Sequence, residues 1–310
     1  MPATGHSGTR RSPAAQGGAA GLRLERVIPF AFTAADRGSE SNDQRAYRDH
    51  VESIYGPLGD FSWLEDGVAV SYHDMVRVIH RELAAELAGI DLIITVDASP
   101  DCRHQSFPAS LLSDLVPGDP LLMGISEQGV AGPFTALRIA VDRLASGSSH
   151  RALVLVMEQS TLPPDDKAVR PARDVAVALL LGPRGTMPLD RPLITATGRG
   201  GAAAPSDAAR PAAGSGPAER EARVLVAGAG LGDLVPGPDV RLTRAAEGHP
   251  CAGVWLALAA LLERGDAPGG QILIADRDPV LPYLCSVRIT LPAEPSMAAH
   301  AQSRQKEGAE

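Results

Sequence analysis

The sequence predicts an α/β protein of two halves, in which strands and helices alternate around mostly parallel sheets. Short, uninterrupted apolar runs, such as residues 91–97, 152–158 and 174–181, are typical of strands that are buried on both faces. Residues 72–87 instead repeat apolar side chains at the three- and four-residue spacing of an amphipathic helix. The second half repeats this strand and helix order in a shortened form from residue 222 onwards.

The first half is expected to open with a strand over residues 22–32. Residues 33–67 are polar and rich in turn formers, so we expect them to be irregular. Gly89 ends the first helix, and the apolar run 91–97 leads through a turn into a second helix that begins near Pro108. Together with the elements that follow, the expected order is β-α-β-α-β-α-β-β.

The second half is expected to contain strands at residues 222–227, 271–275 and 285–291, with a helix over residues 254–264. An Ala/Gly/Pro/Ser-rich segment precedes them and has the composition of a flexible linker. We therefore predict four parts: a disordered leader, an N-terminal half, a C-terminal half with an internal linker, and a disordered tail, at residues 1–21, 22–190, 191–292 with linker 198–221, and 293–310.

Composition excludes several classes of function. The 310 residues carry a formal net charge of −8 without a basic stripe, so nucleic acid is not an expected partner. Three cysteines lack paired spacing, so neither a disulfide framework nor a metal site is predicted, and no cofactor is expected. No apolar run reaches the ~18 residues of a membrane span, and residues 1–21 lack the apolar core of a signal peptide. A cytoplasmic protein is therefore expected.

The most informative stretch is residues 125–137. An apolar strand over residues 120–125 runs into a small-residue turn, and a helix then begins near Val130 and continues to about Leu144. This arrangement places a side chain at a helix N-terminus, where the helix dipole favours a thiolate or an oxyanion. The expected position of a nucleophile holds Val130, which has no nucleophilic group.

Four blocks of the sequence resemble the thiolase superfamily, specifically its β-ketoacyl-ACP synthase III branch. Residues 90–110 are similar to the family's "IDLII…TPD…FPS" block, and residues 125–137 to its "DISAACSGFVYAL" nucleophile segment. Residues 149–158 are similar to "YRRALVVGAE", and residues 174–181 to "FGDGAGAVVL". The resemblance is weaker in the C-terminal half, where residues 248–253 carry it. It implies a thiolase-like αβαβα layered fold of two pseudo-repeated halves.

The same resemblance implies that the catalytic residues are missing. The gapless match places Val130 at the family's cysteine, and a shift by one residue would place Gly129 there. Residues 227–230 contain no counterpart of the family's histidine, and His249 stands where its asparagine is expected. Residues 276–280 replace its glycine loop. Four concurrent departures indicate a site that is no longer catalytic.

Alternatives remain at the second helix start. Residues 248–250 are similar to the "GHP" of thiolases, whose histidine is catalytic, so His249 is either a retained active-site imidazole or a helix-start histidine bonded to backbone. Cys251 is either a thiolate or a small core residue. Gln128 is of interest because some family members replace the nucleophile by glutamine, although it lies two positions early. The candidate substrate-binding residues are Gln128, Gly129, Val130 and Phe134.

The resemblance predicts a non-catalytic, chain-length-shaping subunit of a heterodimeric condensing complex in polyketide or fatty-acid-derived biosynthesis. Non-catalytic partner chains of this kind occur in 2-alkylquinolone synthase and, as chain-length factors, in aromatic polyketide systems. The implied partner is a catalytically intact synthase III-like homologue, with acyl carrier protein or acyl-CoA as further partners. The alternative is an active acyltransferase that uses His249 and Cys251, and a third hypothesis is a standalone acyl-binding protein.

Overall fold

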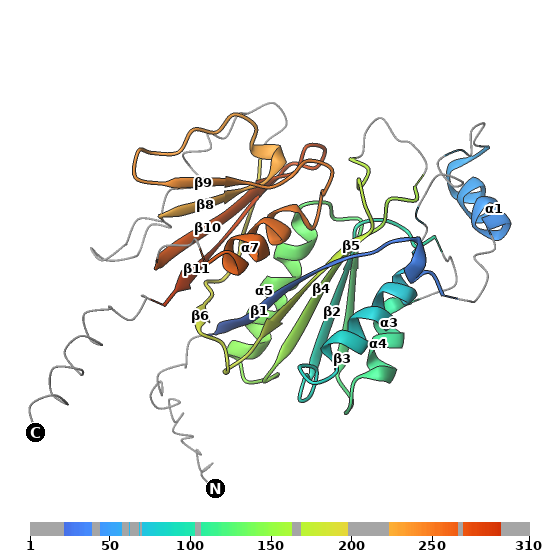
Figure 1. Ribbon diagram of the computed structural model, residues 1–310, viewed down its shortest axis with the longest axis horizontal. Helices are drawn as coiled ribbons and strands as arrows, with labels where there is room; N and C mark the ends of the chain where they lie inside the picture. Colours follow the sequence, from blue (N-terminus) through green and yellow to red (C-terminus); the bar gives the residue numbers. More distant parts are fainter. Residues whose placement is uncertain are drawn as a thin grey trace, which may run out of the picture.

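A computed structural model describes residues 22–38, 44–57, 62, 68, 70–102, 107–162, 169–197, 223–265 and 269–292. These residues form two sheets with helices between them and on the far side of the first sheet (Figure 1). The predicted leader, linker and tail all lie outside the described residues. None of the described helices is both long and apolar enough to cross a bilayer.

The first sheet has six strands in the order β3-β2-β4-β5-β1-β6. Strands β3, β2 and β4 are parallel neighbours, whereas β5 is antiparallel to both β4 and β1. Between β4 and β5 the described residues form no helix, and strands that follow each other without a crossover helix commonly pair antiparallel. The strands are β1 (Arg23–Ala31), β2 (Leu92–Asp97), β3 (Leu121–Ser126), β4 (Ala152–Glu158), β5 (Val175–Leu181) and β6 (Met187–Pro188).

The second sheet has five strands in the order β7-β11-β10-β8-β9. Strand β8 is parallel to β9 and β10, and β11 is antiparallel to β10 and β7. Both sheets are therefore mixed, with a parallel part and antiparallel additions, rather than mostly parallel. The strands are β7 (Leu193–Ala196), β8 (Val224–Ala227), β9 (Arg241–Arg244), β10 (Gly270–Arg277) and β11 (Tyr283–Leu291).

Two helices, α5 (Ala131–Ala145) and α7 (Gly253–Glu263), lie between the sheets (Figure 1). Helices α3 (Tyr72–Leu83) and α4 (Pro108–Leu115) cover the other face of the first sheet. Successive side chains of a strand point to opposite faces of the first sheet and so contribute to two hydrophobic cores. Ile94 packs in the core between the sheets, and its neighbour Ile93 packs in the core under α3 and α4. The strands and helices predicted for the first half occur in the predicted order, with helix α1 (Gln44–Tyr55) and strand β6 as additions.

The fifth layer of the expected αβαβα arrangement is reduced. On the outer face of the second sheet, the described residues supply a single 3-10 turn, η2 (Ala229–Leu231), and a loop that carries Leu234 and Val240. These side chains cover a small apolar cluster that includes Leu225 and Leu273. The structure thus agrees with a shortened C-terminal half.

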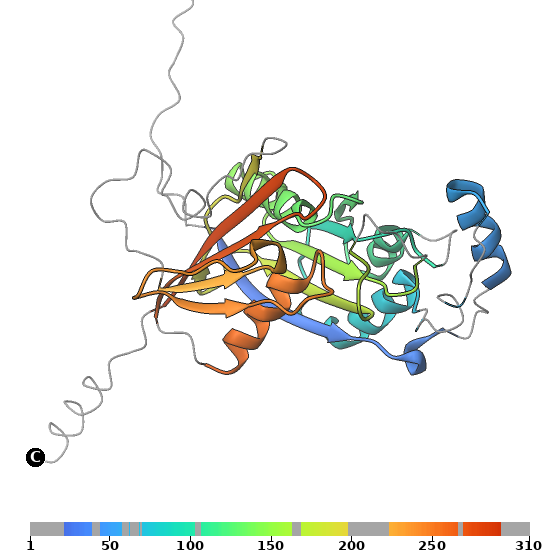
Figure 2. The ribbon, with the colours of Figure 1, turned by 90° about the horizontal axis from the view of Figure 1, so that it is seen from above.

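One prediction for the first half is wrong. Residues 33–67, expected to be irregular, contain the 3-10 turn η1 (Ala34–Asp36) and helix α1 (Gln44–Tyr55). Helix α1 lies at the end of the molecule remote from the second sheet (Figure 2). The apolar residues of its sequence, Tyr47, Val51, Ile54 and Tyr55, do recur at helical spacing, but they lie in a segment whose other residues are mostly polar or charged.

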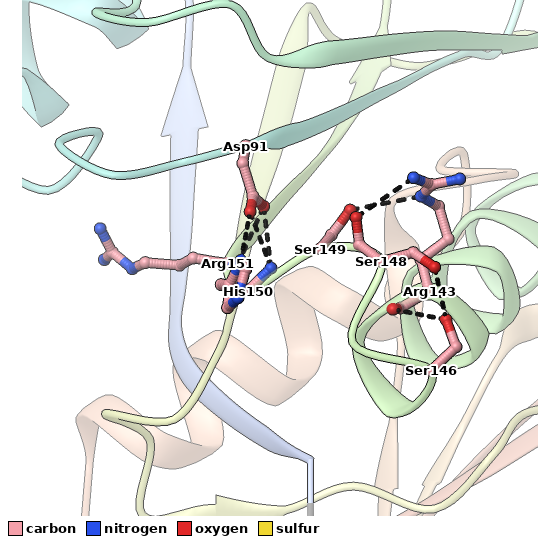
Figure 3. A network of polar contacts seen from close by, with 7 residues as sticks. All are labelled: Asp91, Arg143, Ser146, Ser148, Ser149, His150 and Arg151. Carbon is pink, nitrogen blue, oxygen red and sulfur yellow. Dashed lines mark hydrogen bonds and ion pairs between the residues drawn. The ribbon is translucent and has the colours of Figure 1, made fainter.

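A polar network ties the far end of α5 to the first sheet (Figure 3). The Asp91 carboxylate accepts hydrogen bonds from the backbone N–H groups of His150 and Arg151, and its Oδ2 lies 3.0 Å from Nδ1 of the His150 ring. The Arg143 guanidinium donates to the Ser148 carbonyl and the Ser149 hydroxyl. These bonds join the chain just before β2 to the chain just before β4.

Candidate functional site

The turn between β3 and α5 has the geometry that the sequence predicted for a nucleophile turn. Glu127 and Gly129 both have positive φ, at 57° and 51°, and Val130 is the N-cap of α5. A positive φ is uncommon for a residue other than glycine, so the conformation of Glu127 must be stabilised by the packing around the turn. Residue 130 consequently lies at the positive end of the helix dipole.

The side chain at this position is inert and buried. Val130 is 4% exposed and belongs to the core cluster between the sheets. Its backbone N–H donates to Oδ2 of Asp278 at 2.9 Å. Asp278 comes from the turn between β10 and β11, so a carboxylate stands at the N-terminus of α5, beside the position at which the sequence pattern predicts a nucleophile but which holds Val130.

Cys251 reaches the same turn from the start of α7. Its thiol donates to the Gly129 carbonyl at 3.0 Å. Burial raises the pKa of the Cys251 thiol well above its usual value, and the carboxylates of Glu158, Asp278, Asp276 and Asp97 raise it further. A nucleophilic cysteine needs the opposite, because the thiolate is the reactive form. The structure therefore holds Cys251 as a protonated, buried thiol.

His249 bonds to a carboxylate. Its Nδ1 lies 2.7 Å from Oε2 of Glu158, and its side chain is 10% exposed. The second carboxylate oxygen of Glu158 accepts the backbone N–H groups of Cys251 and Ala252, at 2.6 and 2.8 Å. Glu158 thus orients the His249 ring and also caps the N-terminus of α7 by accepting backbone N–H groups there.

The candidate substrate-binding residues separate into two groups. Gly129 and Val130 lie together with Cys251 and Asp278 at the turn. Gln128 is exposed on the same turn. Phe134 is buried one turn further along α5, where its ring packs against Trp255 of α7 with centroids 5.3 Å apart.

Sequence reasoning missed two residues, Glu158 and Asp278. Glu158 is the only charged residue in the apolar run of β4, and such a residue within a buried strand needs partners. Asp278 was visible only as part of the segment that replaces the family's glycine loop. No local pattern connects either residue to the helix start that it caps.

The surroundings of Cys251 are rich in acids. Burial raises the pKa of Asp276 to about 7, and burial with the nearby Asp101 carboxylate raises that of Asp97 to about 7. Across the described ranges, no three His, Cys, Asp or Glu side chains form a group that could hold a metal ion. The backbone donors that could stabilise an oxyanion, those of Val130, Cys251 and Ala252, already bond to carboxylates.

Comparison with known proteins identifies the fold. No protein-family model matches the chain, and no curated protein matches it in sequence. Solved structures match with little sequence identity. The acyltransferase ChlB3 has a TM-score of 0.54 and 16% identity, over 88% of this chain and 98% of that one.

Two further structures give the same result. 3-Oxoacyl-[acyl-carrier-protein] synthase III of Aquifex aeolicus has a TM-score of 0.55 and 15% identity, over 87% of this chain and 100% of that one. OleA of Xanthomonas campestris has a TM-score of 0.53 and 16% identity, over 87% and 97%. The thiolase-like, synthase III-like fold predicted from the sequence is confirmed.

Proposed function

We propose that this chain, which has a synthase III-like fold, is a non-catalytic subunit of a heterodimeric condensing complex. In that complex it shapes the acyl site, and a cysteine-bearing partner carries out acyl transfer in polyketide or fatty-acid-derived biosynthesis. One observation carries the proposal: both helix starts at the candidate site are occupied by carboxylates of the chain itself. Asp278 fills the start of α5, and Glu158 fills the start of α7.

Condensation requires groups that this site lacks. A thiolate must take up the acyl group, and free donors must stabilise the negative charge that develops on oxygen. Val130 supplies no nucleophile, and the Cys251 thiol is held in its neutral form. The buried acids around Cys251 would also oppose a developing negative charge.

The molecule offers a surface for a partner. Strand β3 is an edge strand, and no described strand pairs with its outer edge. Leu121 of β3 and Leu193 of β7, also an edge strand, are exposed. Helix α5 contacts both strands, so the two edges flank the helix whose start forms the candidate site. An unpaired apolar edge favours addition of a strand from another chain.

Co-expression tests the proposal. The chain would be produced with the nearest encoded synthase III-like chain that retains the cysteine, with an affinity tag on one chain only. We expect a stable 1:1 complex by size-exclusion chromatography with light scattering, and acyl carrier protein-dependent condensation that is lost or altered without this chain. If the chain remained a monomer or homodimer when it was co-expressed with each such partner, the proposal would be wrong.

A second candidate function is an acyltransferase or decarboxylase that uses His249 without a covalent intermediate. The observation in its favour is the hydrogen bond between Nδ1 of His249 and Glu158, which fixes the orientation of the ring. The test is turnover of acetyl-CoA, malonyl-CoA and acyl carrier protein thioesters by the pure chain. Activity should disappear in His249→Ala and persist in His150→Ala, because His150 is 84% exposed and lies at the other end of α5. No turnover in the unaltered chain eliminates this candidate.

A further inference from the structure

We infer that the Asp278 carboxylate occupies the anion-binding position at the N-terminus of α5. Two residues, Val130 and Asp278, would then each prevent this chain from forming an acyl-enzyme. The inference rests on the proposed function, since it explains how the same site became non-catalytic. It goes beyond that function because it predicts that restoring a cysteine at position 130 will not restore a reactive thiol.

Both oxygens of Asp278 are fully engaged. Oδ2 accepts the N–H of Val130, and Oδ1 accepts the N–H groups of Val280 and Leu281 at 2.9 and 2.7 Å. The backbone N–H of Asp278 itself donates to the Tyr283 carbonyl. The side chain is 7% exposed. The carboxylate is therefore held in place by its own turn as well as by α5.

Gly129 shows how closely the carboxylate approaches the turn. A Cβ at position 129 would lie 2.1 Å from Oδ2 of Asp278, which no real side chain tolerates. Gly129 also has a φ of +51°, which disfavours other residues. A nucleophilic side chain at position 129 is thus excluded, and the turn and the carboxylate fit each other.

Electrostatics explains why this arrangement opposes a thiolate. The start of α5 favours one negative charge, and Asp278 already supplies it. A thiolate at position 130 would stand beside that carboxylate, and like charges raise each other's pKa. The other titratable groups near this turn are Glu127 on the turn itself and Cys251, Glu158, His249, Asp276 and Asp97 on the elements around it. Glu158 is bonded at the start of α7, so Asp278 is the carboxylate that stands directly beside position 130.

The test measures the reactivity of an introduced thiol in the isolated chain. Iodoacetamide alkylation of Val130→Cys and of Val130→Cys/Asp278→Asn is followed from pH 6 to 10 and assigned to position 130 by peptide mass spectrometry. Peptide assignment separates the introduced thiol from Cys102, Cys251 and Cys285, which are all buried. The control is Val130→Cys/Asp276→Asn, because Asp276 bonds to Gly230 and Arg277 and not to α5.

We expect the thiol of Val130→Cys to titrate above the ordinary value of about 8.5 for cysteine. The Asp278→Asn change should lower this pKa by at least one unit and speed alkylation at pH 7 by roughly tenfold. The Asp276→Asn control should stay within about twofold of the single variant.

Two results would overturn the inference: rapid alkylation of Val130→Cys with a thiol pKa below the ordinary value, or equal rates with and without Asp278→Asn. Thermal melting verifies that each variant is folded, and Asp278→Ser replaces Asp278→Asn if the latter does not fold. Because no partner is present, these outcomes are independent of the co-expression result, so the two ideas can fail separately.

Discussion

At the scale of single residues, Glu158 is an acidic side chain at a fully buried position that requires hydrogen-bond donors. It is completely buried, yet its two oxygens accept hydrogen bonds from the His249 ring and from two backbone N–H groups at the start of α7. A buried carboxylate is tolerated only with such partners, because leaving a charge unpaired in the interior costs several kcal/mol.

Glu158→Gln should therefore lower the free energy of unfolding by about 1.5–3 kcal/mol, because a neutral amide replaces the hydrogen bonds that the charged carboxylate makes to the His249 ring and to two backbone N–H groups. Urea denaturation at pH 7 measures the change. The matched control is Glu127→Gln on the exposed turn before α5, which should change stability by no more than about 0.5 kcal/mol. Equal effects of the two substitutions would contradict the role given to Glu158.

Asp276 makes stability depend on pH. Its folded-state pKa is about 7, against an ordinary value of 3.8, so folding favours its protonated form. The stability that this group contributes is present at low pH and is lost as the pH rises from about 4 to about 7. A shift of about three units corresponds to at most about 4 kcal/mol.

Asp276→Asn removes the titration, and the amide oxygen can still accept the N–H groups of Gly230 and Arg277. We expect the unfolding free energy of the variant to fall less than that of the unaltered chain between pH 5 and 8. Chemical denaturation across this range is the measurement. Parallel curves for the two proteins would show that Asp276 is ionised with an ordinary pKa.

At the scale of elements, the Asp91 network shows how neighbouring parallel strands are aligned at their starts (Figure 3). Burial acts to raise the pKa of Asp91, but hydrogen bonds from the Arg151 and His150 backbone and from the His150 ring outweigh it and lower the pKa. The stability from Asp91 is therefore present above its ordinary pKa of 3.8 and lost as the pH falls through the lower folded-state value.

Asp91→Asn should cost about 1 kcal/mol at pH 7 and less near pH 3, because Asp91 and His150 are 39% and 84% exposed and solvent weakens the pair. Asp119→Asn, an exposed acid just before β3, is the matched control and should be close to neutral at both pH values. Thermal unfolding at pH 3 and pH 7 gives both numbers. A cost that is larger at pH 3 than at pH 7 contradicts the sign of this argument.

At the scale of the whole molecule, the position of the two apolar edges sets where a partner can bind. Leu121 is 43% exposed on the unpaired edge of β3. The second edge strand of the other sheet, β9, instead begins and ends with Arg241 and Arg244. Charged edge strands resist pairing, and apolar ones favour it, so the side with β3 and β7 is the expected interface.

Leu121→Asp should weaken the proposed heterodimer by at least about tenfold in Kd, since a charge in a strand-pairing interface has to be buried without a partner. The control is Val235→Asp, an exposed valine in the loop after η2, on the outer side of the second sheet. Analytical ultracentrifugation with the partner chain distinguishes them. If Val235→Asp weakened the heterodimer and Leu121→Asp did not, the interface would lie on the outer face of the second sheet and not at the edges of β3 and β7.

How far the sequence predicts this molecule differs between elements. The apolar strands and the helices that begin near residues 72, 131 and 253 follow from residue periodicity, which acts locally. Helix α1 was missed because the turn-forming, polar composition of residues 33–67 was given more weight than the short apolar repeat within residues 44–55. The antiparallel pairs of β5 and β11 depend on how strands pair in space, so no single run of residues reports them.

The candidate site shows the same division. Local sequence patterns are sufficient to predict the strand, the tight turn and the helix that present residue 130, and the sequence shows that this residue is a valine. The groups that bond at the helix starts are set by tertiary packing, because Asp278 is 148 residues from Val130 in the sequence and Glu158 is 91 residues from His249. The physical reason is that a turn is built by the conformational preferences of adjacent residues, whereas a buried carboxylate finds its donors through the packing of two sheets around α5 and α7.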